Sequence, residues 1–315
     1  MTNSGRWGLR ASLAMCASIS CLALAGLANA QVTLGSAVDF AVISDAGPLV
    51  LGNHTVITGT STDVGATYGN VTIGGNNTMI PGDVVTSLFE LGPGATISLA
   101  NYAHVAGTCV TDGGAITLGT GATCANEDTT NTNPDIALIA SAVNQEEDFD
   151  YAVTCLAPTQ SIPAVNLAAS KTQTVTDAVP NGLNVISTPS ITMGGSSVLT
   201  LQGGSLDQVI LETPGNMSLG YGAKIVLAGG LLAQNVWITT TTEPAGFNPP
   251  ATTPSVFLNN SSVVFGSVHG GYTCSLGSGV TINGAIICDY GLTTGPNLTV
   301  HFAPATGLSL PACAG

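Results

Sequence analysis

Six cysteines follow residue 30, and their number and spacing predict disulfide chemistry. They are Cys109, Cys124, Cys155, Cys274, Cys288 and Cys313. An even number of cysteines in an exported chain indicates disulfides. Six cysteines allow fifteen pairings; the spacing favours Cys109 with Cys124 and Cys274 with Cys288, which leaves Cys155 with Cys313. Because there is no CxxC motif and the histidines lack ligand spacing, we expect no metal and no other cofactor.

Several carboxylates could in principle form the acid and base pair of a glycosidase. The candidates are Asp45, Asp63, Asp83, Asp112 and Glu212. Asp83 and Asp112 lie beside glycines, which is typical of turn residues. His104 and His269 are expected at corners rather than as catalytic bases. Since no GxSxG, HExxH or phosphate-binding loop occurs, we expect no enzymatic activity.

The charge balance excludes whole classes of partner. The chain has a formal net charge of −14, with 18 acidic and four basic residues. The basic residues are Arg6, Arg10, Lys171 and Lys224. Without the first 30 residues, two lysines face 18 carboxylates, a net charge of −16. Because phosphate binding depends on Lys and Arg, we expect no binding to nucleic acid or to an anionic membrane.

The N-terminus has the pattern of a signal peptide. Arg6 and Arg10 precede an apolar run over 11–27, and Ala28-Asn29-Ala30 is a small-x-small cleavage site. We therefore predict a signal peptide at 1–30 and a secreted single domain at 31–315. A membrane anchor is the less favoured alternative, because the apolar run is short. The expected location is extracellular, periplasmic or on the cell surface, with no membrane attachment after cleavage.

The elements that must position these residues are short strands. Forty glycines and few aromatic residues favour an all-β protein with tight turns. The pattern L-G-x-G-[AV]-x-[IC] occurs four times, at Leu91–Ile97, Leu118–Cys124, Leu219–Ile225 and Leu276–Ile282. Its glycines permit a corner, and the alternation that follows begins a strand. Because the copies are unevenly spaced, they predict an irregular solenoid.

Two segments depart from this pattern. Residues 134–149 have apolar side chains at Ile136, Ile139, Ala140 and Val143, with Asn133 as a possible cap, which predicts an amphipathic helix along the solenoid. The acidic group 146–148 at its end is expected to be solvated. The Thr/Pro-rich segment 239–255 is expected to be a surface insertion.

Five phrases begin at Leu34 (LGSAVDFAVI), Ser190 (SITMGGSSVLTL), Gln208 (QVILE), Asn235 (NVW) and Leu276 (LGSGVTINGAII), with the predicted helix between the first and second. Together, and in this order, they resemble the secreted ice-binding protein family. Val56-Ile57-Thr58-Gly59 is similar to the family's first-coil phrase. The resemblance covers nearly the whole chain after residue 30. It implies a right-handed β-helix with one long α-helix packed along its side, and adsorption to ice. The segment 239–255 and the six cysteines depart from the family pattern.

Outward threonines on the rungs are the candidate contact residues, because the methyl group excludes water, the hydroxyl orders it and the β-branch restricts χ1. The alternative reading is that threonine is simply a good strand former. A role in adhesion, or as a structural protein of the cell surface or biofilm matrix, competes with ice binding, with the chain either monomeric or assembled end to end. The candidates are Thr55, Thr58, Thr60, Thr72, Thr78, Thr96, Thr117, Thr192, Thr200, Thr281 and Thr293.

Overall fold

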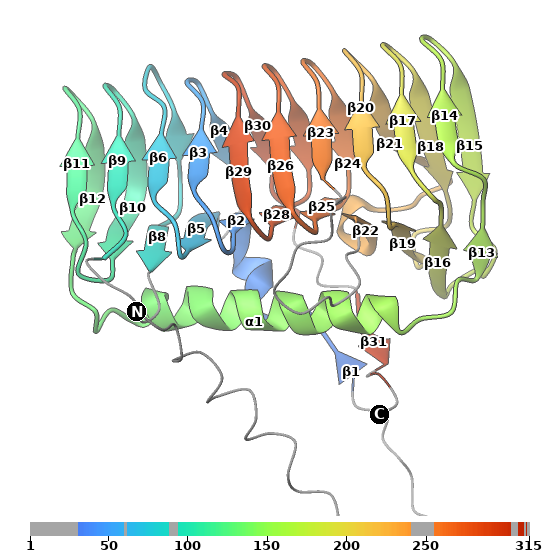
Figure 1. The fold of residues 1–315 in the computed structure, drawn as a ribbon, viewed down its shortest axis with the longest axis horizontal. Helices are drawn as coiled ribbons and strands as arrows, with labels where there is room; N and C mark the ends of the chain where they lie inside the picture. Colours follow the sequence, from blue (N-terminus) through green and yellow to red (C-terminus); the bar gives the residue numbers. More distant parts are fainter. Residues whose placement is uncertain are drawn as a thin grey trace, which may run out of the picture. The chain divides into compact units, whose positions relative to one another are not determined.

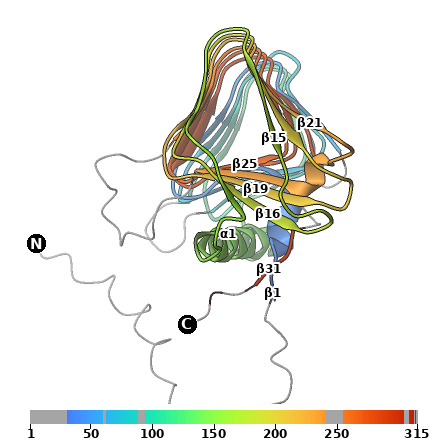
Figure 2. The ribbon, with the colours of Figure 1, turned by 90° about the vertical axis from the view of Figure 1, so that its right-hand side faces the viewer.

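The short strands stack into a right-handed parallel β-helix, with the long helix α1 beneath it (Figure 1). The computed structural model describes residues 31–59, 62–87, 94–240, 255–303, 308–311 and 313. The expected signal peptide, Thr60 and residues 241–254 of the expected insertion lie outside the described residues. Seen end-on, the β-helix has a triangular cross-section, so each rung contributes a strand to each of three faces (Figure 2).

The first face, called the helix face, is buried on both sides, because its inner residues fill the solenoid and its outer residues contact α1. Its strands therefore consist mainly of buried residues. The face begins with the C-terminal halves of β12 (Thr123–Asp128) and β10 (His104–Thr111). It continues in spatial order with β8 (Val84–Ser87), β5 (Asp63–Thr67), β2 (Phe40–Ser44), β28 (Ile286–Cys288), β25 (Ser267–Gly270), β22 (Val236–Thr240), β19 (Gln208–Thr213), β16 (Leu183–Ser187) and β13 (Gln160–Ser161).

The second face, called the ten-stranded face, consists of short strands of three or four residues. Most of them have two inward apolar residues around one outward residue, so a single outward row runs along the face. In spatial order they are β11 (Ile116–Leu118), β9 (Ile97–Leu99), β6 (Val71–Ile73), β3 (Leu49–Leu51), β29 (Gly291–Thr294), β26 (Thr273–Leu276), β23 (Val256–Leu258), β20 (Met217–Leu219), β17 (Ile191–Met193) and β14 (Val165–Leu167).

The third face completes the triangle. It contains the N-terminal halves of β12 and β10, followed in space by β7 (Met79–Ile80), β4 (Val56–Thr58), β30 (Thr299–His301), β27 (Thr281–Asn283), β24 (Val263–Phe265), β21 (Lys224–Ala228), β18 (Val198–Gln202) and β15 (Thr172–Thr176). Two 3-10 turns, η1 (Gly35–Asp39) and η2 (Ala233–Asn235), precede β2 and β22. Among the described strands, β1 (Gln31–Val32) and β31 (Leu310–Pro311) form the one antiparallel pair.

The chain builds the solenoid from two halves that meet in the middle. Strands β2 to β12 build rungs from the centre towards one end, and β13 to β30 build rungs from the other end back to the centre (Figure 1). The halves join where β2, β3 and β4 pair with β28, β29 and β30. The chain must therefore travel the length of the solenoid between β12 and β13, and α1 spans most of it, since 21 residues extend about 31 Å.

Helix α1 (Pro134–Thr154) begins where the sequence predicts and ends later. The side chain of Asn133 accepts a hydrogen bond from the backbone of Asp135, and Pro134 occupies the first turn, as expected. The predicted end at residue 149 is wrong, because Phe149, Ala152 and Val153 are buried against the solenoid.

A glycine in β5 allows close packing of the helix. A Cβ atom at Gly65 would lie 2.1 Å from Cδ1 of Ile139, so a larger residue would force the Ile139 side chain to move.

The glycine-rich pattern forms the same corner in three of its four copies. Leu118, Leu219 and Leu276 end strands of the ten-stranded face. The second glycine of each copy then turns with positive φ, between 65° and 70°. The copy at 91–97 is different: residues 91–93 lie outside the described residues, and Ile97 begins β9 instead of continuing into the third face.

Three disulfides join the pairs that the spacing favours. Cys109 pairs with Cys124 and Cys274 with Cys288, each linking adjacent rungs, and Cys155 pairs with Cys313. The first two have closed loops of 15 and 14 residues, whereas the third connects positions 158 residues apart. That third bond fastens the C-terminal segment to the end of α1.

Candidate functional site

The outward row of the ten-stranded face is the most regular surface of the described residues. Strand pairing places one outward residue of each strand in register with the next. Seven of the ten are Thr or Ser, and none is charged. In spatial order the row is Thr117, Ser98, Thr72, Val50, Thr293, Ser275, Phe257, Ser218, Thr192 and Asn166.

The same register continues on both sides of this row through backbone hydrogen bonds. On one side, for example, the N–H of Gly74 donates to the carbonyl of Leu51, and on the other the N–H of Val71 donates to that of Thr96. The flanking positions are uncharged as well. Before the row they are Ala115, Thr96, Asn70, Pro48, Gly291, Thr273, Ser255, Asn216, Ser190 and Ala164; after it they are Gly119, Ala100, Gly74, Gly52, Gly295, Gly277, Asn259, Gly220, Gly194 and Ala168.

Such a face can order water. Its small hydroxyl and methyl groups repeat at the rung spacing of about 4.8 Å. The inward neighbours Leu51, Ile73 and Leu99 are at most 1% exposed, so the sheet behind the row is firmly packed. Because the threonine χ1 angle is restricted on a strand, the hydroxyl groups are held in a fixed array.

Five of the predicted threonines lie on this face. Thr72, Thr117, Thr192 and Thr293 are exposed members of the row, and Thr96 flanks it. Three others, Thr58, Thr200 and Thr281, lie on the third face instead. Thr60 lies outside the described residues.

The prediction that Thr55 and Thr78 point outward is wrong. Both are fully buried at corners between the ten-stranded face and the third face. The Thr55 hydroxyl donates to the carbonyl of Gly52 at 2.8 Å, and the Thr78 hydroxyl donates to that of Gly75 at 3.2 Å. Their hydroxyl groups therefore hydrogen-bond to backbone carbonyls of the turn instead of facing solvent.

The row also contains serines that the threonine search missed. Ser98, Ser218 and Ser275 have the same position in their strands as the threonines. A signal was present: each is the polar residue directly before a leucine, and Ser218 and Ser275 directly precede the glycine-rich pattern, as Thr117 does.

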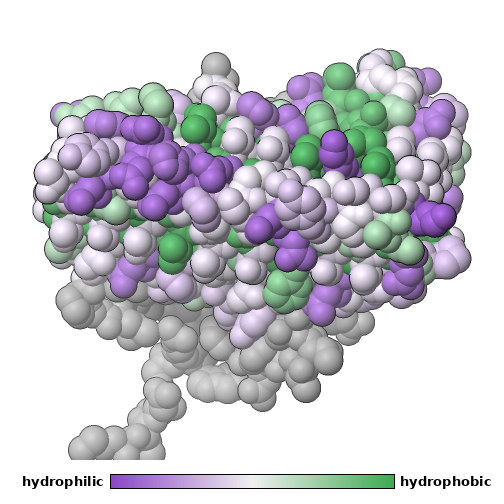
Figure 3. Space-filling model, turned by 90° about the horizontal axis from the view of Figure 1, so that it is seen from above, coloured by the Kyte–Doolittle hydropathy of each residue, from purple (hydrophilic) through white to green (hydrophobic). Residues whose placement is uncertain are grey.

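The third face is less regular and partly apolar. Its outward residues include Lys224, His104, His301 and Met79. Figure 3 shows hydrophobic side chains gathered on one part of this side of the molecule. There a groove of about 550 Å³ is lined mainly by Val226, Leu227, Leu231, Leu232, Phe265 and Phe302.

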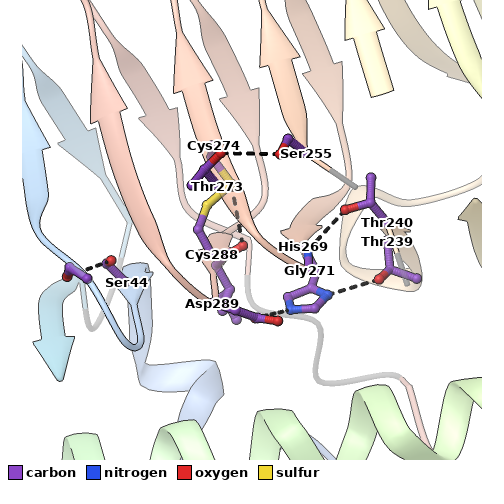
Figure 4. Close-up of a disulfide and its surroundings, with 12 residues drawn as sticks. Ser44, Thr239, Thr240, Ser255, His269, Gly271, Thr273, Cys274, Cys288 and Asp289 are labelled. Carbon is purple, nitrogen blue, oxygen red and sulfur yellow. Dashed lines mark hydrogen bonds and ion pairs between the residues drawn. A yellow bond between two sulfur atoms is a disulfide. The ribbon is translucent and has the colours of Figure 1, made fainter. Parts of the chain in front are cut away.

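A charged cluster is buried between α1 and the helix face. His269 and Glu146 are each only 1% exposed. Nε2 of His269 lies 2.9 Å from Oε1 of Glu146 and 2.8 Å from Oδ1 of Asp289, and Nδ1 lies 3.3 Å from Oδ1 of Asp150. Figure 4 shows the imidazole between Asp289 and Thr239.

Two expectations are corrected by this cluster. His269 lies within β25 and not at a corner, and Glu146 is buried rather than solvated, because α1 continues beyond it. Burial alone would lower the pKa of His269, but the carboxylates of Glu146, Asp150 and Asp289 raise that pKa well above its usual value. Burial raises the pKa of the Glu146 carboxyl to about 7, against the effect of His269.

The five carboxylates considered for catalysis do not gather around one cleft. Asp63 and Asp83 are neighbours on adjacent rungs, where Oδ1 of Asp63 accepts a hydrogen bond from the Asp83 N–H at 2.9 Å. Asp45 lies elsewhere, with Thr67 and close to Asp289. Burial raises the pKa of Asp63 to about 6, with Asp83, Asp135 and Asp39 adding repulsion.

Asp63→Asn is expected to stabilise the protein at neutral pH. The folded-state pKa of about 6 lies above the ordinary value of 3.8, so ionised Asp63 disfavours folding. That penalty is absent below pH 4, develops between pH 4 and 6, and is complete above pH 6. With solvent screening taken into account, the gain at pH 7.5 is about 1 kcal/mol. Urea unfolding at pH 3.5 and 7.5 tests this prediction. Asparagine keeps the hydrogen-bond acceptor, so an equal gain in the free energy of unfolding at both pH values would show that the gain does not come from removing the ionised carboxylate.

Within the described residues, no helix is long and apolar enough to cross a membrane. No protein-family model matches the chain, and no curated protein sequence matches it. Solved structures do match its fold, at low sequence identity.

Three similar structures are ice-binding proteins. The antifreeze-active ice-binding protein of an Arctic yeast is 16% identical, with 87% of this chain and 96% of that chain covered and a TM-score of 0.51. The DUF3494 domain of Shewanella frigidimarina ice-binding protein 1 is 15% identical, with coverages of 86% and 97% and a TM-score of 0.53. The ice-binding protein of the Antarctic ascomycete Antarctomyces psychrotrophicus is 18% identical, with coverages of 87% and 99% and a TM-score of 0.50. The chain therefore has the β-helical fold of these ice-binding proteins.

Proposed function

We propose that the protein is secreted and binds ice, without catalysis, through the ten-stranded face. The observation that carries this proposal is the outward Thr/Ser row with uncharged flanks on both sides. The likeness in fold to ice-binding proteins supports it. Three disulfides fit an oxidising location outside the cytoplasm.

The physical basis is a match between a repeating surface and a repeating lattice of water. Ice presents no charge, so a binder gains little from ionic side chains, and charged groups hold water in competing arrangements. The row combines methyl groups, which exclude water, with hydroxyl groups, which hydrogen-bond to it. Because each rung repeats the same backbone position, one ordered water layer can extend across many rungs.

The third face is the weaker candidate. Lys224 and the two histidines interrupt it with charged or titratable groups, and the groove beside Phe265 removes its flatness. The helix face is covered by α1. In the central row of the ten-stranded face, three of the ten residues are neither Thr nor Ser: Val50, Phe257 with its exposed ring, and Asn166 at one end.

The substitution Thr72→Tyr tests this assignment. Thr72 is an exposed member of the row, and the tyrosine ring would project from the face and keep neighbouring rungs from the ice. We expect it to remove most of the thermal hysteresis while the circular dichroism spectrum and the midpoint of thermal unfolding stay unchanged. Thermal hysteresis and ice-crystal shape are the measurements, made on the purified protein with its disulfides intact.

Thr174→Tyr is the matched control, since Thr174 is an exposed strand residue of the third face. This variant is expected to keep full activity. Loss of activity in Thr174→Tyr alone would move the contact surface to the third face. Round ice crystals and no thermal hysteresis with the parent protein would contradict the ice-binding proposal. That result would favour adhesion or matrix assembly through the end strands β11 and β14.

A further inference from the structure

The buried cluster below β25 brings together three metal-ligating side chains from separate parts of the chain. Glu146 comes from α1, His269 from β25, and Asp289 directly follows Cys288 at the end of β28. One oxygen or nitrogen atom from each lies within 4.8 Å of the other two. Because Glu146 and His269 are far apart in the sequence, residue spacing does not predict a site here.

The hydrogen bonds on Nδ1 determine which nitrogen of His269 faces the carboxylates. The Thr239 hydroxyl donates its one hydrogen to Oδ1 of Asp150 at 3.0 Å. The contact of 2.9 Å between that hydroxyl oxygen and Nδ1 must therefore have Nδ1 as donor. The Thr239–Asp150 pair thus holds the imidazole in the orientation that an outer partner gives to a metal-binding histidine. Nε2 is left facing Glu146 and Asp289.

A single proton on Nε2 does not satisfy both carboxylates. Asp289 Oδ1 is in hydrogen-bonding contact with Nε2, whereas Oε1 of Glu146 accepts no hydrogen bond although it is buried and only 2.9 Å from Nε2. Glu146 and Asp289, with Asp150 behind them, bring three carboxylates to one imidazole. The only described lysines, Lys171 and Lys224, are exposed on other faces. Among the described residues, the imidazole of His269 is therefore the one group in the cluster that can carry positive charge, and it faces three carboxylates.

We propose that Glu146, His269 and Asp289 bind one divalent transition-metal ion, with Zn²⁺ as the probe. Ligands about 2.1 Å from a tetrahedral ion are about 3.4 Å apart. The observed separations of 2.8 and 2.9 Å from Nε2 need only a small outward movement to match this. One nitrogen with two carboxylate oxygens suits a transition metal better than Ca²⁺ or Mg²⁺, which prefer oxygen alone.

The surroundings fit a structural metal site. Asp289 is 27% exposed, so an ion can reach the cluster from solvent. The disulfide between Cys274 and Cys288 holds the backbone next to Asp289 in place (Figure 4). The bound ion would join α1 to two strands of the helix face, and the site is separate from the ten-stranded face.

Tryptophan fluorescence gives a direct test. Trp237 is the one tryptophan after residue 30, and its ring stacks on His269 with centroids 6.0 Å apart. After dialysis against a chelator, Zn²⁺ is titrated into the intact protein and bound metal is counted by native mass spectrometry. We expect one Zn²⁺ per chain, a saturable change in emission, and a higher midpoint of thermal unfolding. Mg²⁺ is expected to produce none of these.

Glu146→Gln and Asp148→Asn separate a specific site from general acidity. Both remove one negative charge from α1 without changing shape, but Glu146 is buried in the cluster whereas Asp148 is exposed. We expect Glu146→Gln to weaken Zn²⁺ binding at least about tenfold, the loss that even an outer-sphere partner can cause, and Asp148→Asn to leave it unchanged. Absence of Zn²⁺ binding in the parent protein, or equal binding in the two variants, would overturn the proposal.

Discussion

Replacing Trp237 with alanine is expected to lower the free energy of unfolding by about 3–5 kcal/mol. The indole is 1% exposed and lies between the helix face and α1. Its ring meets Phe149 edge-on, with centroids 5.3 Å apart at an angle of 69°, and stacks on His269. Alanine would leave a cavity in a layer that the long helix prevents from collapsing. Urea unfolding followed by circular dichroism measures the loss, with an unchanged m value as the sign of two-state behaviour.

Trp237→Phe is the control for this prediction. Phenylalanine keeps a ring against Phe149 and removes the indole N–H, which is buried without an acceptor among the described residues. Removing an unsatisfied donor offsets part of the stability lost with the smaller ring. We therefore expect the free energy of unfolding to fall by less than about 1.5 kcal/mol. Equal costs for alanine and phenylalanine would show that aromatic packing is not what Trp237 contributes.

Features that depend on neighbouring residues were predictable from the sequence. The start of α1 follows from Asn133 and Pro134, because a cap acts on backbone groups within one turn. The end of α1 does not, because Phe149 and Val153 are buried by strands that come much later in the chain. Local patterns therefore predict where this helix begins, and tertiary packing decides where it ends.

The ten-stranded face likewise combines a feature that the local sequence predicts with one that only strand pairing reveals. Alternation around Thr72, Thr117, Thr192 and Thr293 predicts outward side chains, but only the pairing register shows that they share one row. The chain order conceals this register, since β3 pairs with β29 from the other half of the protein. Thr55 has similar neighbours in sequence yet points inward, because it follows a corner residue, His54, with positive φ.

The buried cluster could not be predicted at all. Glu146 belongs to an acidic run that is typical of a solvated helix end, and His269 is an isolated histidine in a strand. They meet because α1 passes beneath β25 on its way along the solenoid from β12 to β13 (Figure 1). The path of the chain, rather than any local motif, places a carboxylate beside that imidazole.

Removing the disulfide between Cys155 and Cys313 is expected to cost more stability than removing either of the others. In the chain-entropy account, a bond that closes 158 residues contributes about 5 kcal/mol, and one that closes 14 or 15 residues about 3 kcal/mol. Alanine pairs at each disulfide avoid placing a hydroxyl in the core. Urea unfolding of the three double variants and the parent under non-reducing conditions gives the order.

The three disulfides differ in burial as well as in loop length, so the order of their stability losses distinguishes two explanations. Cys109 and Cys288 are fully buried and Cys274 nearly so, whereas Cys155 is exposed. If lost packing dominated, the two short-loop pairs would cost most, because their sulfur atoms leave cavities in the core. If loop closure in the unfolded chain dominates, the exposed long-range pair costs most despite its poor packing. Losses that follow burial instead of loop length would contradict the prediction and assign the stabilisation to the folded state.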